Sequence, residues 1–338
     1  MSEMNKPARR PDLRVWLVAA VVVLAAAALI GVLAAQIVSR PSVTRGDSSS
    51  QNETDSEGFA DTVLLDGQTY VRNTRLKAVL LLGIDQSAEQ IASRDPNLFG
   101  NGGRADAIAV LIVDPDSLTA RVLEISRETM VDVDVYDQMD RYLYTSQMQL
   151  TLQYACASSL QRGNWLMKNK VSELLYGIPI DAAAALTMDG IPAVVDAAGG
   201  VTLTMQQDYT YIDPAFAKGA TLTMDGAQAE RFIHYRDISV TGSNTDRMER
   251  HAQVLRALAS QLEGADDAAV TRLQNAAEPY LETDIDADTL ALLAQCRLDP
   301  VIYSVPGEVR ASSSSDEFYT DEDALRRLVV ELFYLPAD

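Results

Sequence analysis

Cysteine and histidine are scarce in this sequence of 338 residues. The chain contains only Cys156, Cys296, His234 and His251. A structural zinc site usually takes four such side chains at short spacings, so the sequence excludes a zinc ribbon and argues against a structural zinc site. The two cysteines lie far apart in the chain. They could pair in an oxidising compartment or remain two separate buried thiols.

Basic residues are also few, since 28 Lys and Arg stand against 48 Asp and Glu and leave a formal net charge of −20. Proteins bind duplex DNA mainly through Lys and Arg that neutralise phosphates, so we expect no nucleic-acid partner. The same balance argues against broad docking on anionic lipid. A small anion site lined by a few arginines is still compatible with it, because such a site depends on local charge.

One long apolar run is present at residues 15–38, VWLVAAVVVLAAAALIGVLAAQIV, in which Gln36 is the only strongly polar residue. As a helix it would span the roughly 30 Å hydrocarbon core of a bilayer. The basic residues before it are Lys6, Arg9, Arg10 and Arg14, and those soon after it are Arg40 and Arg45. The excess of positive charge on the first side predicts a cytoplasmic tail at residues 1–14 and an extracellular remainder.

The apolar run could instead belong to a cleaved signal peptide, but the apolar region of a signal peptide is usually shorter, about 7–15 residues. An uncleaved single-pass anchor in the cell membrane is therefore favoured. Residues 39–59, with RPSVTRGDSSSQNETDSEG at 40–58, are rich in Ser, Asp and Glu and show no apolar periodicity. We expect a flexible stalk there and a single extracellular domain at residues 60–338.

The domain begins with short apolar runs that are typical of buried strands. They are KAVLLL at 77–82, AIAVLIV at 107–113 and the alternating RVLEIS at 121–126. Residues 114–117, Asp-Pro-Asp-Ser, favour a turn, so the second and third strands are predicted to form a hairpin.

Helical and extended patterns alternate through the rest of the domain. Helices are predicted at 165–175, 191–198, 225–233, 247–262 and from about Asp321 onward, and strands at 201–205 and 301–305. This mixture predicts an α/β fold in which a mixed central sheet is covered by helices in α-β-α layers, preceded by the transmembrane helix.

Charged side chains cluster where these strands begin or end. Asp85 follows the first strand, Arg104 and Asp106 precede the second, and Arg127 follows the third. Taken singly, such residues are ordinary, because strand-end aspartates commonly form turns. Two carboxylates beside several arginines favour a metal-assisted phosphate site instead.

A further group of arginines accompanies the helix predicted at 247–262. Arg247 and Arg250 lie three apart in its first turn, and Arg236 lies shortly upstream. Helix N-termini attract anions, and arginine suits a bidentate grip on phosphate, although arginines on helices are often simply solvated or salt-bridged.

Seven stretches in order resemble the LytR–CpsA–Psr family of bacterial envelope phosphotransferases, most closely its clostridial members. They are LLLGID at 80–85, GGRADAIAVLIVD at 102–114, VLEISRETMVDV at 122–133, ELLYGIPID at 173–181, VVDAAGGVTLTM at 194–205, MDGAQAERFIHYRD at 224–237 and DRMERHAQVL at 246–255. The resemblance implies transfer of a glycopolymer, such as a teichoic acid or capsule, from a polyprenyl-pyrophosphate carrier to peptidoglycan through a phosphodiester bond.

The resemblance also implies the site residues and an Mg²⁺ cofactor. The metal-site aspartates correspond to Asp85 and Asp106, the pyrophosphate-binding arginines to Arg104, Arg127, Arg236, Arg247 and Arg250, and the catalytic residues to Asp106 and Arg127. Mg²⁺ commonly binds one or two carboxylates together with phosphate oxygens and water, which agrees with this set.

The sequence departs from the family pattern at three positions. His234 stands where the first arginine of an R-x-R motif is usual, Asn244 stands where a carboxylate is common, and His251 replaces a common Gln. Loss of a permanent cation would weaken phosphate binding or make it depend on pH. Two alternatives to the transferase therefore stay open: a non-catalytic protein that senses polyprenyl-linked precursors, and a pyrophosphate hydrolase.

Overall fold

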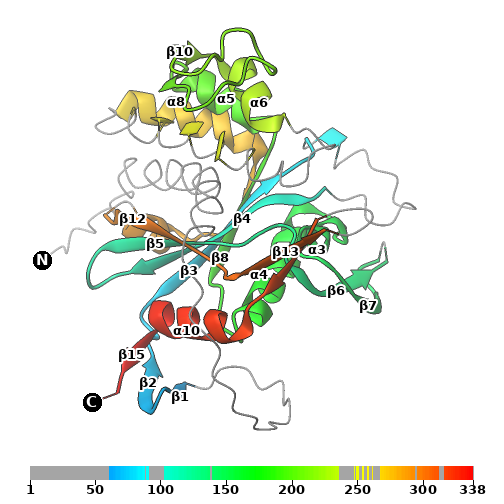
Figure 1. The fold of residues 1–338 in the computed structure, drawn as a ribbon, viewed down its shortest axis with the longest axis vertical. Helices are drawn as coiled ribbons and strands as arrows, with labels where there is room; N and C mark the ends of the chain where they lie inside the picture. Colours follow the sequence, from blue (N-terminus) through cyan, green and yellow to red (C-terminus); the bar gives the residue numbers. More distant parts are fainter. Residues whose placement is uncertain are drawn as a thin grey trace, which may run out of the picture.

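The computed structural model describes residues 61–337 except 88, 91–102, 138, 236–246, 248, 251–252, 255–256, 259–260, 262–266, 294 and 312–315. A mixed six-stranded sheet forms the centre of the molecule, with the strand order β11-β8-β3-β4-β5-β12 (Figure 1). Its strands are β3 (Lys77–Ile84), β4 (Ala105–Asp114), β5 (Thr119–Glu124), β8 (Ala182–Thr187), β11 (Leu281–Thr283) and β12 (Arg297–Ser304).

The three apolar runs form adjacent strands of this sheet, as predicted. β3 pairs antiparallel with β4, and β4 pairs antiparallel with β5 across the turn at 114–117, so the hairpin is confirmed. β8 runs parallel to β3, and β12 runs parallel to β5. The mixed central sheet expected from the sequence is thereby confirmed, and the strands read as continuous apolar runs because both faces of the sheet are buried.

Side chains alternate between the two faces along each strand. Leu80 and Leu82 of β3 lie on one face, together with side chains of three helices. These helices are α3 (Thr151–Ala155), α4 (Leu160–Leu174) and α10 (Glu322–Phe333). Val79 and Leu81 lie on the opposite face with Leu290 of α9 (Ala287–Leu293). Helices therefore cover both faces of the sheet.

Local capping explains where several helices begin. α4 begins at Leu160, before the predicted start at 165, because the Ser159 hydroxyl accepts the N–H of Arg162 at 3.1 Å and caps the helix. Asp321 caps α10 by accepting the N–H of Ala324 at 3.0 Å. The described residues among 247–261 are helical, in agreement with the helix predicted there.

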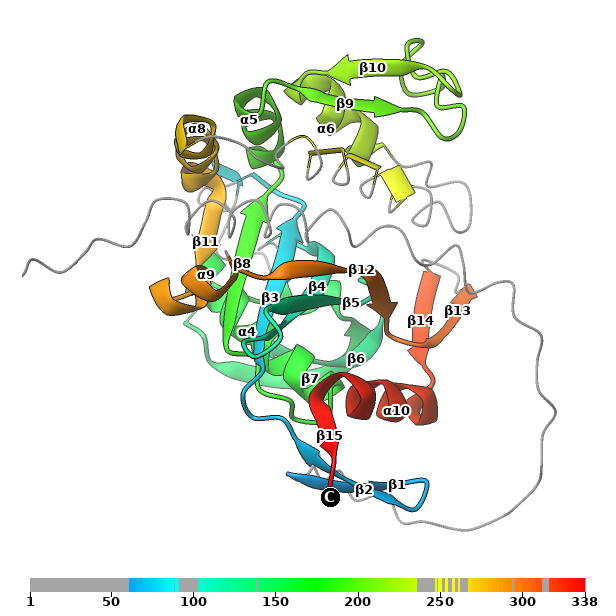
Figure 2. The same cartoon turned by 90° about the vertical axis from the view of Figure 1, so that its left-hand side faces the viewer.

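A smaller layer lies beyond one end of the sheet, where the arrowheads of β3 and β8 point (Figure 2). We call this layer the cap. It contains α5 (Gly190–Ala197), β9 (Val201–Thr204), β10 (Thr221–Met224), α6 (Gly226–His234), α8 (Asp267–Ala277) and the helical residues of 247–261, and η2 (Glu278–Tyr280) leads from α8 back to β11. The cap has its own apolar core around Phe216, Met224 and Phe232.

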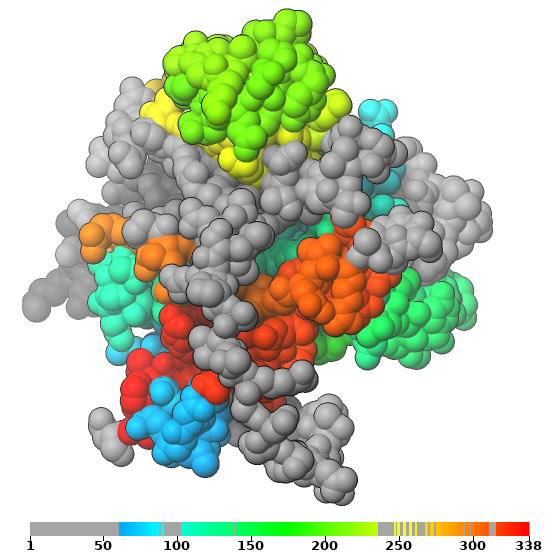
Figure 3. All heavy atoms as spheres, viewed as in Figure 1, coloured from blue at the N-terminus to red at the C-terminus, as the bar shows by residue number. Residues whose placement is uncertain are grey.

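Three small sheets complete the fold. They are β1 (Thr62–Leu65) with β2 (Gln68–Arg72) and β15 (Tyr334–Pro336), β6 (Met130–Tyr136) with β7 (Tyr142–Gln149), and β13 (Gly307–Ala311) with β14 (Asp316–Thr320). The β1-β2-β15 sheet lies at the end of the molecule opposite the cap (Figures 1 and 2). In Figure 3 the cap forms a distinct lobe above the sheet.

Both cysteines are free thiols in the structure. Cys156 is buried beside Val133 and Val135, and burial raises the pKa of its thiol to about 11. Of the two possibilities left open by the sequence, the structure shows two separate thiols.

The predicted membrane helix at 15–38 lies outside the described residues, as do the tail at 1–14 and the stalk at 39–59. Within the part of the chain that the structure describes, no helix is long and apolar enough to span a bilayer.

Glu124, the last residue of β5, is a carboxyl buried inside the sheet, with 2% of its surface exposed. Its Oε2 accepts a hydrogen bond from the Ser304 hydroxyl at 3.3 Å, while Oε1 has no hydrogen-bond partner among the described residues. Burial raises the pKa of Glu124 from 4.5 to about 8. The carboxyl is therefore neutral in the folded protein at pH values where it is charged in the unfolded chain.

We predict that Glu124 makes the protein less stable as pH rises. Its contribution is complete below pH 4.5 and is lost as pH rises through about 8, because the folded state holds the proton longer. Glu124→Gln, which carries no charge, should remove a decline on the order of 1–4 kcal/mol in the free energy of unfolding between pH 5 and 9.

Urea unfolding at several pH values measures this difference. The matched control is Glu308→Gln, because the Glu308 side chain is 65% exposed. A Glu124→Gln profile parallel to the wild-type profile would contradict the prediction.

Candidate functional site

The register of the sheet places Asp106 opposite Arg127. β4 and β5 pair Ala109 with Glu124, and the N–H of Ile125 donates to the carbonyl of Ile108 at 3.0 Å. Continuing this register by two residues brings position 106 across from position 127. Two of the predicted catalytic residues therefore meet because one hairpin closes at 114–117.

Asp85 lies at the same edge of the sheet, directly after β3. Its N–H donates to the carbonyl of Arg104 at 3.0 Å, and its Oδ1 accepts the N–H of Arg104 at 2.6 Å. Gly103 makes this close approach possible, because its φ of +84° suits glycine and an added Cβ would lie 2.9 Å from Ile84 Cγ2. Two hydrogen bonds with the backbone of Arg104 thus join Asp85 to the segment that leads into β4.

Asp106 is held between two arginines that come from distant parts of the chain. Arg127 Nη1 donates to Oδ1, and Arg247 Nη1 donates to Oδ2 at 2.8 Å. The three side chains are 13%, 9% and 9% exposed, in the order Asp106, Arg127 and Arg247. Arg247 belongs to the cap, so these ion pairs connect the cap to the sheet edge. Such shielded pairs are much less screened by salt than surface pairs.

The two carboxylates influence each other. Burial raises the pKa of Asp85 above its ordinary value, the hydrogen bond from the Arg104 N–H opposes this rise, and the nearby charge of Asp106 adds to it. Asp85 therefore takes up a proton more readily than a solvated aspartate does.

The carboxylates also form the part of the site that suits a metal ion. Within the described residues, no group of three or more His, Cys, Asp or Glu side chains could hold a metal alone. Two neighbouring carboxylates nevertheless suit Mg²⁺, which usually completes its six ligands with phosphate oxygens and water. The donor set fits a metal bound together with a phosphorylated substrate.

The remaining predicted arginines differ in their surroundings. Arg104 is exposed beside Asp85. Arg250 is 1% exposed, and its guanidinium donates to the carbonyls of Phe232, at 2.6 Å, and of Tyr235. Arg250 thus stabilises the end of α6, and its predicted contact with pyrophosphate stays a prediction. Arg236 lies outside the described residues.

The positions that depart from the family pattern lie close to this region. His234 is exposed and is the last residue of α6, and it lies in the chain between Phe232 and Tyr235, whose carbonyl groups accept hydrogen bonds from Arg250. Asn244 and His251 are outside the described residues. A weakly basic imidazole therefore stands at the surface of the cap where the family usually has an arginine.

Thr187 and Asp189 were not singled out from the sequence, although they lie at the same edge. β8 pairs Thr187 with Ile84 of β3, and the Thr187 hydroxyl donates to Asp189 Oδ1 at 2.5 Å. The available signal was a carboxylate two residues after an apolar strand, close to the pattern that pointed to Asp85.

We predict that Arg250→Ala lowers the free energy of unfolding by about 2–4 kcal/mol, because two carbonyls lose charge-assisted donors inside the cap. Arg104→Ala, at an exposed position, should change it by less than about 0.5 kcal/mol. Urea unfolding of both variants measures the difference. Equal stability of the two variants would show that Arg250 is not a structural residue.

Comparison with known proteins relates the sequence of this chain to one family. A model of the LytR_cpsA_psr family matches residues 41–328. The polyisoprenyl-teichoic acid–peptidoglycan teichoic acid transferase TagU of Bacillus licheniformis is 23% identical over 262 residues, which cover 75% of this chain and 76% of that protein.

Solved structures agree with the fold. The crystal structure of TagU from B. subtilis superposes with a TM-score of 0.52 at 18% identity and covers 77% of this chain and 97% of that one. A structure described as TagT bound to LIIa-WTA gives a TM-score of 0.52 at 19% identity, over 77% of this chain and 90% of that one. Because the family model spans most of the sequence, the chain belongs to the LytR–CpsA–Psr family.

Proposed function

We propose that this protein transfers a glycopolymer of the teichoic acid or capsule type from a polyprenyl-pyrophosphate carrier to peptidoglycan through a phosphodiester bond. Membership of the family supports the proposal, as do the names of the related TagU transferases. The observation that carries it is the Asp106 carboxylate held between Arg127 and Arg247, next to Asp85.

The arginines suit the electrostatic part of this reaction. A pyrophosphate carries several negative charges, and Arg104, Arg127 and Arg247 offer fixed positive charges at the same sheet edge. Phosphoryl transfer depends mainly on positioning and on neutralising charge at the phosphate oxygens. The low exposure of Arg127 and Arg247 strengthens their field compared with arginines in bulk water.

In the proposed reaction a hydroxyl of peptidoglycan attacks the phosphorus on the sugar side of the pyrophosphate. A new P–O bond forms to the acceptor oxygen, and the bridging P–O bond breaks, so polyprenyl phosphate leaves with the electron pair. The hydroxyl proton passes to a carboxylate, for which Asp106 is our first choice and Asp85 the neighbouring alternative.

We also propose Mg²⁺ as the cofactor, held by Asp85 and Asp106 together with pyrophosphate oxygens. When bound, the ion would neutralise charge on those oxygens. Both oxygens of Asp106 already accept arginine N–H groups. Asp85 would therefore supply the more accessible carboxylate oxygen, Oδ2.

A single-pass anchor at residues 15–38, with the domain outside the cell membrane, is part of the proposal. A lipid-linked substrate and the enzyme would then be confined to the same bilayer. The acidic composition agrees with this arrangement, since most of the chain would not adhere to anionic lipid.

Arg127→Ala and Asp106→Ala should each lower polymer transfer by about 100-fold or more, because the first removes a cation at the reacting phosphate and the second removes the carboxylate that holds Arg127 and Arg247 and would accept the proton. The assay measures attachment of radiolabelled polymer to peptidoglycan by the full-length protein in detergent. Arg310→Ala is the control, since that side chain is 60% exposed on β13. Arg127→Lys, which keeps the charge, should fold and show intermediate activity. Absence of transfer by the wild-type protein would rule out the proposed function, and unchanged transfer by both alanine variants would rule out this site.

Removal of divalent metal should abolish transfer, and added Mg²⁺ should restore it. Asp85→Asn should raise the Mg²⁺ concentration required for half-maximal activity by about tenfold, because one charged ligand is lost. Binding of Mn²⁺ in the presence of pyrophosphate, followed by electron paramagnetic resonance, provides a readout independent of turnover. Full activity in excess chelator would exclude the metal.

A further inference from the structure

A row of aromatic rings and one guanidinium group lies on the surface shared by α4 and the β6–β7 hairpin, away from the proposed reaction site. The guanidinium of Arg162 lies 4.1 Å from the ring centroid of Trp165 and 5.0 Å from that of Tyr136. Tyr136 in turn meets Tyr142 edge to face, with ring centroids 6.0 Å apart. Trp165 is 46% exposed and Tyr142 is 58% exposed. We call Tyr136, Tyr142, Arg162 and Trp165 the aromatic platform.

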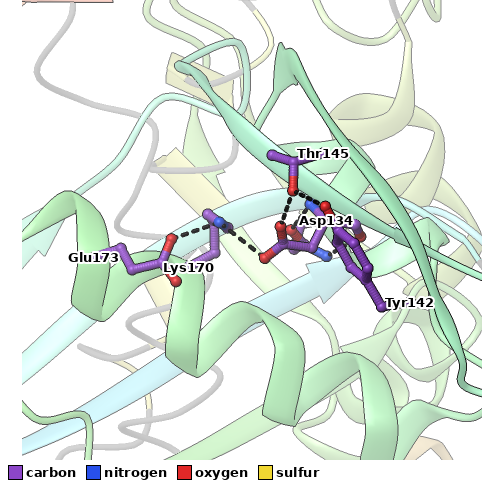
Figure 4. Close-up of polar contacts among 6 residues, drawn as sticks. Asp134, Tyr142, Thr145, Lys170 and Glu173 are labelled. Carbon is purple, nitrogen blue, oxygen red and sulfur yellow. Dashed lines mark hydrogen bonds and ion pairs between the residues drawn. The ribbon is translucent and has the colours of Figure 1, made fainter.

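A chain of polar contacts runs beside the platform (Figure 4). The hydroxyl of Tyr142 lies 2.9 Å from that of Thr145, and Thr145 donates to Asp134 Oδ1 at 2.6 Å. Asp134 also pairs with Lys170 at 3.1 Å, and Lys170 pairs with Glu173. Burial alone would lower the pKa of Lys170, but the hydrogen bonds to Glu173 and Asp134 outweigh it and raise the pKa. Lys170 therefore stays charged and holds the carboxylates of Asp134 and Glu173 in place.

The hairpin is attached to the domain along its length. The side chain of Gln153 accepts the N–H of Asp134 at 2.9 Å and donates to its carbonyl at 3.0 Å, which holds the middle of β6 against α3. Near the tip, the Ser158 hydroxyl donates to Asp140 at 2.8 Å. These contacts hold the rings in place before any ligand arrives, and a preorganised surface loses less entropy on binding.

The base of the hairpin lies next to the proposed site. β6 begins three residues after Arg127, and the N–H of Thr151, which follows β7, donates to the carbonyl of Arg127 at 3.1 Å. The β6–β7 hairpin would thus bind a long molecule on the platform, and the base of this hairpin lies close in the chain to Arg127, a predicted catalytic residue.

The chemistry of the platform favours a sugar chain as its ligand. Exposed Trp and Tyr rings offer flat apolar surfaces with polar edges, which suit the C–H faces of sugars. Carboxylates and hydroxyls beside the rings can bind sugar hydroxyls. An exposed apolar patch with a polar rim is typical of an interaction site.

Charge decides which sugar chain fits. The hairpin at residues 130–149 carries four aspartates and one arginine, and α4 adds one arginine, two lysines and one glutamate, so the two elements together have a formal net charge of −1. The surface therefore offers no excess of positive charge to a teichoic acid type of polymer, which has a phosphate in every repeat. The sugar backbone of peptidoglycan consists of N-acetylated units and is largely uncharged.

We propose that the aromatic platform binds the glycan strand of peptidoglycan and holds this acceptor while its hydroxyl reaches the site. The inference rests on the proposed function, because it assigns the acceptor of that reaction to a surface. It makes Trp165 and Tyr142 binding residues without a part in the chemical step.

Binding of peptidoglycan glycan chains whose lactyl carboxylates are capped as amides, and which are therefore uncharged, to the full-length protein in detergent tests the proposal. Trp165→Ala and Tyr142→Ala should each weaken binding about tenfold, whereas Trp165→Phe, which keeps a ring, should retain most of it. Tyr144→Ala is the matched control, because Tyr144 is 51% exposed on the same strand but pairs with Val135, on the face opposite Thr145 and Asp134. Wild-type binding by both alanine variants would overturn the proposal, as would tighter binding of free teichoic acid at these residues.

Transfer kinetics distinguish a failure of the platform proposal from a failure of the proposed transferase function. Trp165→Ala should raise the KM for long acceptor strands about tenfold without changing kcat or the KM for a single disaccharide acceptor. Arg127→Ala should lose transfer but bind glycan chains normally. If the wild-type protein showed no transfer while glycan binding still depended on Trp165, the proposed function would fail and the platform would stand. If transfer occurred but neither ring affected acceptor binding, only the platform would fail.

Discussion

The arrangement of the site depends on one shielded carboxylate, that of Asp106, and the two arginines that bind it. Charges placed out of water are costly unless they are paired in good geometry, and Asp106 pairs with Arg127 through one oxygen and with Arg247 through the other. The three residues come from the start of β4, the segment after β5 and the cap. Satisfying one negative charge therefore also fixes the position of the cap over the sheet edge.

The sequence predicted the part of this arrangement that local rules control. Apolar runs identify β3, β4 and β5, and a turn at 114–117 implies that the ends of its two strands meet, which brings Asp106 to Arg127. The position of Arg247 follows no such rule, because 141 residues separate it from Asp106. Only the packing of the cap decides that contact.

Residues of the same type also proved to have different surroundings. Arg247 and Arg250 look equivalent in a motif, yet the first reaches Asp106 and the second is buried against the carbonyls of α6. No element was predicted for residues 130–149, although VDVDV alternates as a strand does. The partner strand β7 is mostly exposed, although half of its residues are aromatic or apolar, so its pairing with β6, rather than burial, accounts for its structure.

The pairing of β2 with both β1 and β15 has a practical consequence for labelling the molecule. Tyr334 pairs with Arg72, and the N–H of Ala337 donates to the carbonyl of Thr69 at 2.8 Å, so the described domain starts and finishes at the same place. That place lies at the opposite end from the cap (Figure 2). A fluorophore or fusion partner attached after Ala337 would sit beside the point where the chain enters the domain. Such a probe would label the molecule without crowding the cap or the Asp106 carboxylate at the opposite end.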